Sequence, residues 1–222
     1  MIAIPPTLAR EVEARSQEFE SLSAEEIVAW AIRLFSPRLT LACSFQDCVL
    51  VDMVVSEEPT TEVLFIDTGF HFPETLQYVD VVARRYELNL RIVRAGLEAD
   101  ASKCGTPRCC ELRKVKPLNR ALRGQSAWMS GLKRCDAPTR ACAPTVSLDE
   151  ARQLVKVNPL ARWSDEDVER YIVEHQLPVH PLRAHGYLSI GCAPTTTPVA
   201  LGDDRRSGRW KGTRKVECGL HT

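Results

Sequence analysis

Residues 39–55 read LTLACSFQDCVLVDMVV, which is an apolar run, a polar turn and a second apolar run in direct succession. The first run, at 39–43, has the length of a buried strand, and the second, at 48–55, continues without a helix breaker. The polar turn at 44–47 therefore joins a strand to a helix. This unit builds parallel sheets, because parallel strands need a crossover connection between them.

The same unit recurs further along the chain. Residues 62–66 form another apolar run, the turn Asp67-Thr68-Gly69 follows it, and a helix is predicted from about residue 73 to 86. The later segments repeat the pattern, with strands predicted at 90–93 and 127–130 and a helix at 113–122. We therefore expect an α/β fold with a parallel sheet flanked by helices, which binds ligands beyond the carboxyl ends of its strands.

Serine caps mark two further helices. Ser23 and Glu26 form a capping-box pattern, and Ser164 precedes an acidic first turn in a helix predicted at 165–175. From residue 177 onward the chain is rich in Pro, Gly and Arg and shows little periodicity, which predicts an irregular C-terminal tail. We expect one domain over residues 1–210 and a mobile C-terminal segment over residues 211–222.

The length and the charge of the chain limit the classes of function that it can have. The 222 residues suit a single domain. Lys plus Arg and Asp plus Glu number 29 each, so the net charge is zero and no basic field is available to hold nucleic acid. The N-terminus lacks the basic region of a signal peptide, and no apolar run approaches the roughly 18 residues of a membrane span. We expect a cytoplasmic protein without nucleic-acid or membrane partners.

Two clusters of arginine interrupt this neutral background. The first lies at residues 134–140, in a short loop, and the second at 205–209, in the tail. Guanidinium groups bind phosphate and sulfate oxygens at two points, so the clusters indicate a small polyanionic ligand. The alternative is an ordinary solvated, charged surface.

Nine cysteines in a chain without a secretion signal indicate metal ligation or thiol chemistry rather than a disulfide framework. The tandem pair Cys109-Cys110 suits ligation, since a disulfide between neighbours is strained. Cys192 begins a turn shaped like a C-x-x-C motif in which Thr195 takes the place of the second cysteine. Each of these cysteines taken singly is also compatible with a small buried hydrophobic residue.

Cys218 lies in the sequence VECGLHT at the end of the chain. Arg214, Lys215 and His221 are neighbours that would stabilise its thiolate, which is the nucleophilic form. A mobile tail could carry such a thiol from a site to an external reductant. An incidental terminal cysteine is the alternative.

Taken together, the chain from about residue 39 to 221 resembles the adenylyl-sulfate and phosphoadenylyl-sulfate reductase family. The resemblance rests on eight ordered segments: SFQD (44–47), DTG (67–69), CCELRKV (109–115), PTR (138–140), KVNPL (156–160), GYLSIGCAP (186–194), GRW (208–210) and ECGLH (217–221). It implies a fold like that of the adenine-nucleotide pyrophosphatases. It also implies an oxidoreductase of sulfate assimilation and cysteine biosynthesis that uses thioredoxin or glutaredoxin.

The implied reaction is the reduction of adenosine 5'-phosphosulfate to sulfite and AMP through a cysteine S-sulfonate on Cys218, with His221 assisting. The resemblance places the phosphosulfate against Ser44, Phe45, Gln46 and Asp47. It places the adenosine against Asp67, Thr68 and Gly69. The basic residues that it implies for substrate binding are Lys114, Arg134, Arg140, Arg206 and Arg209. A homo-oligomer is left open.

In this family, a tandem cysteine pair and a C-x-x-C pair hold a 4Fe-4S cluster in the members that prefer adenosine 5'-phosphosulfate. Cys109, Cys110 and Cys192 match these ligands, and Thr195 stands at the fourth position. Three thiolates are one short of the usual four, so we expect a cluster that is incomplete or labile. Three outcomes stay open. Thr195, water or a spare thiol among Cys104, Cys135 and Cys142 binds the fourth iron; the cluster loses this iron; or the site is empty and the cysteines are free.

Three alternatives remain. Family members without a cluster usually prefer the 3'-phosphorylated substrate, phosphoadenylyl sulfate. A nucleotidyl-transferring enzyme of the pyrophosphatase type would need a glycine-rich loop where Phe45 and Gln46 stand, and it would release pyrophosphate from ATP. A zinc- or iron-binding regulatory module would account for the cysteines but would leave the Cys218 motif and the arginine clusters unexplained.

Overall fold

The computed structural model describes residues 6–96, 100, 103–200, 202–213 and 215–220. Its centre is a six-stranded sheet in the order β3-β2-β1-β4-β6-β5. The strands are β1 (Leu39–Ala42), β2 (Glu62–Asp67), β3 (Leu90–Arg94), β4 (Ala127–Ser130), β5 (Val146–Asp149) and β6 (Leu154–Val157). All neighbouring strands are parallel except β5 and β6, which are antiparallel.

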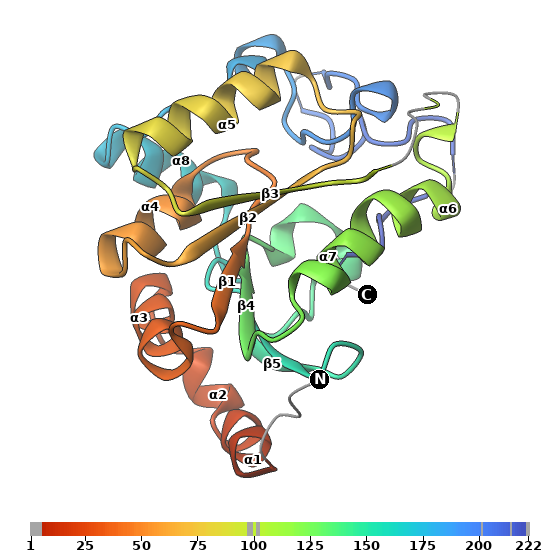
Figure 1. Ribbon diagram of the computed structural model, residues 1–222. Helices are drawn as coiled ribbons and strands as arrows, with labels where there is room; N and C mark the ends of the chain where they lie inside the picture. The colour runs from red at the N-terminus through yellow and green to blue at the C-terminus, as the bar shows by residue number, and fades with distance from the viewer. Residues whose placement is uncertain (1–5, 97–99, 101–102, 201, 214, 221–222) are drawn as a thin grey trace.

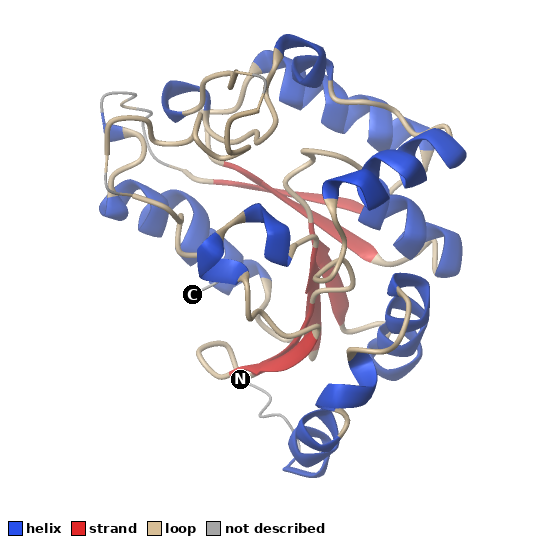
Figure 2. Cartoon of the chain, turned by 180° about the vertical axis from the view of Figure 1, so that it is seen from behind, coloured by secondary structure: helices blue, strands red, loops and turns tan. Residues whose placement is uncertain are grey.

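Helices cover both faces of this sheet (Figure 1). The helices are α1 (Pro6–Ala14), α2 (Ser16–Phe19), α3 (Ala24–Phe35), α4 (Val49–Glu57), α5 (Pro73–Arg85), α6 (Pro107–Cys110), α7 (Lys116–Ala121) and α8 (Asp165–Glu174), with a π-helical turn, Glu111–Val115, between α6 and α7. Helices α3, α4, α5 and α8 lie on one face and α7 on the other. Figure 2 shows from behind that the strands form one curved layer between the helices.

The predicted α/β fold with helices on both faces is confirmed. The structure adds elements that were not expected, namely the helices α1, α2 and α6 and the strands β5 and β6. The antiparallel pairing of β5 with β6 follows from the short turn between them, which reverses the chain, whereas a parallel pair would need a long crossover.

The serine caps are in place. The Ser23 hydroxyl accepts a hydrogen bond from the Glu26 amide at 3.1 Å, and the Glu26 carboxylate accepts one from the Ser23 amide at 2.7 Å. Ser164 caps α8 in the same way with Asp167. These bonds satisfy amides that would otherwise lack partners in the first turn, so each helix begins where the sequence predicts.

Two clusters of buried side chains hold the helices on the sheet. The larger cluster includes Phe19, Trp30, Phe45 and Phe65 and fills the face under α3, α4, α5 and α8. The smaller includes Leu64, Leu118, Leu122 and Trp128 and lies under α7. The helices are thereby fixed, which leaves the loops at the carboxyl ends of the strands free to build a site.

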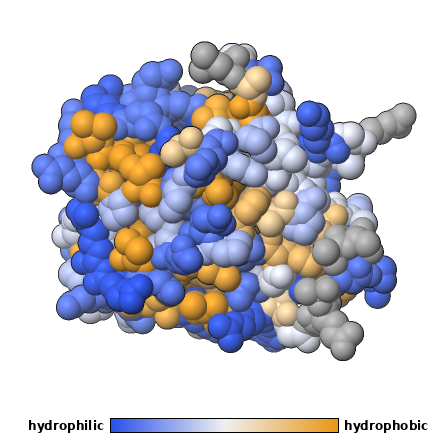
Figure 3. All heavy atoms as spheres, turned by 90° about the horizontal axis from the view of Figure 1, so that it is seen from above, coloured by the Kyte–Doolittle hydropathy of each residue, from blue (hydrophilic) through white to orange (hydrophobic). Residues whose placement is uncertain are grey.

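The surface carries scattered apolar side chains, among them Val81 of α5 and Val173 of α8, which is 74% exposed. Seen from above, hydrophobic patches are separated by hydrophilic residues (Figure 3). Isolated apolar side chains of this kind are normal on a water-facing surface. Within the described residues, the helices are too short or too polar to cross a membrane.

Candidate active site

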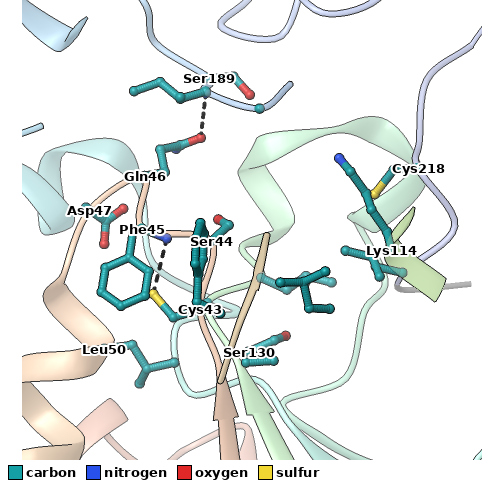
Figure 4. Close-up of a pocket in the computed structure, with 18 of the residues that line it drawn as sticks. Cys43, Ser44, Phe45, Gln46, Asp47, Leu50, Lys114, Ser130, Ser189 and Cys218 are labelled. Atoms are coloured by element: carbon teal, nitrogen blue, oxygen red, sulfur yellow. Dashed lines mark hydrogen bonds between the residues drawn. The ribbon is translucent and has the colours of Figure 1, made fainter. Parts of the chain in front are cut away.

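A cavity opens at the carboxyl ends of β1, β2 and β4 (Figure 4). Loops from distant parts of the chain line it: the turn after β1, the segment after β4, and the loops around Ser189, Arg206 and Cys218. Its charged lining groups are mostly basic, with Asp47 as the acidic one and Lys114, Lys133, Arg140, Arg206 and Arg209 as the basic ones. A chain with no net charge therefore concentrates positive charge at this cavity.

The turn after β1 is held in an unusual conformation. Phe45 has a φ of 53°, in the left-handed region, which is costly for a bulky residue. Its buried ring packs edge-on against Phe65 at 5.6 Å, which offsets this strain. Gln46 Oε1 accepts a hydrogen bond from the Ile190 amide at 3.0 Å, so the turn is tied to the loop that leads to Cys192.

Asp47 joins this turn to α4. Its Oδ1 atom accepts a hydrogen bond from the Val49 amide at 3.2 Å. Burial raises the pKa of the Asp47 carboxyl above its ordinary value, although Arg183, Lys133 and Arg205 act in the opposite direction.

Among the basic residues that line the cavity, Arg209 has the clearest unused capacity to bind an anion. Its Nε atom is buried and has no hydrogen-bond partner in the described part of the chain. Its guanidinium lies 4.6 Å from the Trp210 ring centre. A Cβ atom at Gly191 would come within 2.1 Å of the guanidinium, so only glycine leaves room for it there. A buried guanidinium N–H without an acceptor is energetically costly, so an anionic ligand that accepts a hydrogen bond from this atom would bind favourably here.

Lys114 lies beside Cys218, across the cavity from Ser44 and Gln46 (Figure 4). No carboxylate of the described residues pairs with this lysine. Burial by itself would lower the pKa of Lys114, but nearby Cys192, Cys218 and Cys110 outweigh burial and raise it. A positive ammonium therefore stands next to the thiol that the sequence identified as a nucleophile.

The segment that carries Cys218 is docked over the cavity. Arg140 holds Glu217 through two hydrogen bonds, of 2.7 Å from Nε to Oε1 and 2.9 Å from one terminal nitrogen to Oε2. Arg206 approaches the same carboxylate at 3.5 Å. Burial raises the pKa of Glu217, and the hydrogen bond from Arg140 outweighs this and lowers it. The prediction of a separate, mobile segment stays a prediction, since the structure describes one docked position.

A second, smaller cavity adjoins the first, and four thiols line it: Cys104, Cys109, Cys110 and Cys192. Thr195 also lines it. The thiol of Cys104 hydrogen-bonds with Cys192, and this bond lowers the pKa of the Cys192 thiol, with Lys114 and Thr68 acting in the same direction. The predicted ligands Cys109, Cys110 and Cys192 are thus brought together, with Cys104 in addition.

Another group of possible metal ligands, Cys135, Asp136 and Asp165, has its ligand atoms within 4.8 Å of one another. Lys133 pairs with both aspartates, and Arg205 also pairs with Asp165. These cations already neutralise the carboxylates. The group is an ion-pair network, and it lies apart from the four thiols.

Most of the residues predicted to bind the substrate line the first cavity: Ser44, Phe45, Gln46, Asp47, Thr68, Lys114, Arg140, Arg206 and Arg209, together with Cys218. Arg134 does not, because its guanidinium pairs with Glu20 at 2.7 Å and with the Ala143 carbonyl at 2.8 Å. Asp67 and Gly69 hydrogen-bond to each other at 2.9 Å outside the lining. His221 falls outside the described residues.

Lys133 and Ser189 are among the residues that line the first cavity without having been predicted as site residues. Lys215, suggested from the sequence as a neighbour of Cys218, instead donates hydrogen bonds to Cys110 Sγ at 2.9 Å and to the Gly105 carbonyl at 2.7 Å. The position of Lys133 directly after a predicted strand was the signal available for it. Ser189 lies within GYLSIGCAP (186–194), one of the segments that carry the family resemblance, and this was the signal available for it. No local signal marked the contacts of Lys215.

Comparisons with known proteins agree with this geometry. Residues 37–198 match the phosphoadenosine phosphosulfate reductase domain. The adenosine 5'-phosphosulfate reductase of Mycobacteroides abscessus is 46% identical over 220 residues, which cover 94% of this chain and 92% of that protein. The enzyme of the same name from Mycolicibacterium smegmatis is 45% identical over 220 residues, with the same coverage.

Among solved structures, the phosphoadenylyl-sulfate reductase from Candida auris, in a phosphate complex, superposes with a TM-score of 0.74 at 29% identity, over 88% of this chain and 99% of that chain. A Candida glabrata FMN adenylyltransferase shares the fold, with a TM-score of 0.59 at 16% identity over 83% of this chain and 66% of that one. The pyrophosphatase-like fold and the predicted family are both confirmed: this chain belongs to the phosphoadenosine phosphosulfate reductase domain family.

Proposed function

We propose that this protein is an oxidoreductase that reduces adenosine 5'-phosphosulfate to sulfite and AMP. The observation that carries the proposal is the meeting of Cys218, Lys114 and Arg209 around one cavity, where the buried Nε atom of Arg209 has no hydrogen-bond partner among the described residues. The curated relatives that match nearly the whole chain are named for this activity, which agrees with the prediction from the sequence.

The substrate fits the cavity by charge and by polarity. Its phosphosulfate group would lie between the turn at residues 44–47 and the cations Lys114, Arg206 and Arg209. The apolar part of the lining, which includes Leu41 and Leu160, would take the uncharged purine. Contacts of Asp67, Gly69 and Arg134 with the substrate stay predictions, because these residues do not line the cavity.

The chemistry begins with the Cys218 thiolate attacking the sulfur of the substrate. The S–O bond to the phosphate breaks, AMP leaves with the bonding electrons, and the cysteine carries an S-sulfonate. The phosphate of AMP is a weak base and needs no strong general acid. Lys114 and Arg209 stabilise the negative charge that grows on the phosphate oxygens.

The second half of the reaction needs a dithiol reductant, for which we propose thioredoxin or glutaredoxin. Its thiolate attacks Cys218 Sγ, sulfite leaves with the electron pair of the S–S bond, and a mixed disulfide remains. The second thiol of the reductant then resolves this disulfide, which returns Cys218 as a thiol and leaves the reductant oxidised. Cys218 is partly exposed, which leaves it accessible to such a partner.

The cysteines that line the second cavity fit an iron–sulfur cluster. There are four of them, from two different loops, and four cysteine thiolates ordinarily hold a 4Fe-4S cluster. When bound, a cluster would link the loop that carries Cys109 and Cys110 covalently to the loop that carries Cys192. It would also place negative charge beside Lys114.

Sulfite release with thioredoxin, measured in parallel on adenosine 5'-phosphosulfate and phosphoadenylyl sulfate, tests the proposal. Faster release from the first substrate is expected. Faster release from the 3'-phosphorylated substrate would favour the alternative, a phosphoadenylyl-sulfate reductase. No sulfite from either substrate, together with pyrophosphate release from ATP, would replace reduction with nucleotidyl transfer.

A further inference from the structure

We infer that Cys104 is the fourth thiolate ligand of the iron–sulfur cluster and takes over the place that Thr195 leaves vacant in the C-x-x-C turn. The inference rests on the cluster proposed above and concerns which residue completes it. It follows from the contacts of Thr195, the packing of the loop that carries Cys104, and the positions of the other free thiols.

The Thr195 hydroxyl is already engaged. It donates a hydrogen bond to the Cys192 carbonyl at 3.3 Å, within the turn of residues Ala193–Thr195. A neutral hydroxyl is also a hard oxygen donor and a poor ligand for iron in a sulfide cluster. Thr195 therefore stabilises the turn, and the fourth ligand of the cluster must come from another residue.

Cys104 comes from a different loop and lies beside Thr195, at the fourth ligand position. Its sulfur lies 4.0 Å from the Thr195 hydroxyl oxygen and in hydrogen-bonding reach of Cys192. Gly105 makes the approach possible: it has a φ of 85°, and a Cβ atom there would come within 2.8 Å of Thr195 Cγ2 and 3.2 Å of Trp210 Cδ1. The backbone at Gly105 thus packs directly against the turn that contains Thr195, and this contact places the Cys104 thiol beside Thr195.

The loop is also fixed relative to the tandem cysteines. The Thr106 hydroxyl accepts a hydrogen bond from the Cys109 amide at 3.1 Å and caps the short helix that carries Cys109 and Cys110. Lys215 Nζ bridges the Gly105 carbonyl and Cys110 Sγ. An ammonium at this position would stabilise thiolates and the negative charge of a thiolate-bound cluster.

The other spare thiols are elsewhere. Cys135 is exposed and hydrogen-bonds to the Trp163 carbonyl at 3.3 Å. Cys142 is exposed as well. Neither lines the cavity that holds Cys109, Cys110 and Cys192. Of the three candidates that the sequence left open, Cys104 is the one that the fold brings to the ligand set.

The test uses the full chain purified without oxygen, with iron and acid-labile sulfide assayed per chain. We expect about four iron atoms in the unchanged protein and in Cys142→Ser, the matched control. Cys104→Ser should lose at least about one iron of the four, and the double variant Cys104→Ser with Thr195→Cys should regain it, because the thiolate returns to the C-x-x-C position. Thr195→Cys alone should leave the iron content unchanged.

A second measurement does not depend on a variant folding. In the native, unchanged protein, Cys104 should resist alkylation together with Cys109, Cys110 and Cys192, while Cys135 and Cys142 react, and removal of iron with a chelator should expose all four. Full iron in Cys104→Ser with loss of iron in Cys109→Ser would overturn the role of Cys104 and leave the cluster in place. A protein without iron, or a Cys104–Cys192 disulfide in the native protein, would overturn both the role of Cys104 as a ligand and the proposed cluster.

Discussion

Arg140 and Glu217 form a two-point ion pair in which both side chains are almost completely buried, at 11% and 13% exposure. Glu217 directly precedes Cys218, so this pair fixes the proposed nucleophile over the cavity. Arg140 was expected from the sequence to bind the anionic substrate. Its main partner in the structure is instead Glu217, in the segment that carries Cys218, and Asp136 is a second partner at 3.2 Å.

Glu217→Gln should therefore loosen the C-terminal segment. A hydrogen bond to a charged group contributes about 1.5–3 kcal/mol, so its loss should shift the docking equilibrium by about tenfold or more toward the undocked form. The rate at which iodoacetamide alkylates Cys218, followed by peptide mass spectrometry, should rise accordingly. Glu57→Gln, on the exposed end of α4, is the control. An unchanged rate in Glu217→Gln would show that the pair does not hold the segment.

The same pair predicts a pH dependence. Because the pKa of Glu217 is lowered in the folded protein, its contribution to docking is complete above the ordinary glutamate value near 4.3 and is lost only as the pH falls through the lowered value. Between pH 5 and pH 8, the ratio of the Cys218 alkylation rate in the unchanged protein to that in Glu217→Gln should therefore stay flat. A rise in this ratio between pH 6 and pH 5 would contradict the assignment.

Arg209→Ala should weaken substrate binding by about 10- to 150-fold, which corresponds to one charged hydrogen bond of about 1.5–3 kcal/mol. Its guanidinium contributes little to the core, so the melting temperature should change little. Gly191→Ala should act in the same direction, because the added methyl group would displace the guanidinium. Calorimetric titration with AMP and thermal melts separate the two effects. A large fall in melting temperature with unchanged binding would make Arg209 a structural residue.

Lys156 should destabilise the folded protein at neutral pH. Burial lowers the pKa of its ammonium to about 8, although Asp149 opposes the shift. Below pH 8 the folded state carries the cost of a buried charge. Between pH 8 and the ordinary lysine value near 10.4, the folded protein releases this proton before the unfolded chain does, so stability rises with pH.

Lys156→Met should accordingly raise the melting temperature at pH 7 by about 2–4 °C, for a net gain of about 1 kcal/mol after loss of the cation–π contact with Trp128 at 5.1 Å. The difference between the variant and the unchanged protein should shrink by pH 10. A difference that grows with pH would show that the charged Lys156 ammonium stabilises the folded protein. Lys116→Met, at an exposed lysine, controls for the general loss of a positive charge.

Much of the fold could be predicted because its elements carry strong local signals. Strand β2 and helix α5 lie within a residue of their predicted bounds, since an uninterrupted apolar run and a helical apolar spacing specify them. Strand β5 has only four residues, and only its first is buried, so it carries no clear alternation. The π-helical turn at Glu111–Val115 has no sequence signature distinct from an ordinary helix.

The site was harder to predict where it depends on contacts between distant residues. Arg134 looks like a substrate ligand in sequence, but its partner, Glu20, lies 114 residues away, and no local pattern links the two. Cys104, Cys135 and Cys142 are equivalent as spare thiols in the sequence. Only the left-handed turn at Gly105 and its packing on Thr195 distinguish Cys104, and both are properties of the folded chain.

The most direct test of the covalent role of Cys218 is the mass of the C-terminal peptide after the protein is incubated with adenosine 5'-phosphosulfate and no reductant. We expect one equivalent of AMP to be released and the peptide that contains Cys218 to gain the mass of one SO3 group. Cys218→Ser should show neither change but should still bind AMP. Thioredoxin added afterwards should release sulfite and return the peptide to its original mass. Release of AMP with an unmodified peptide would contradict the covalent mechanism, because the substrate would then react without a bond to Cys218.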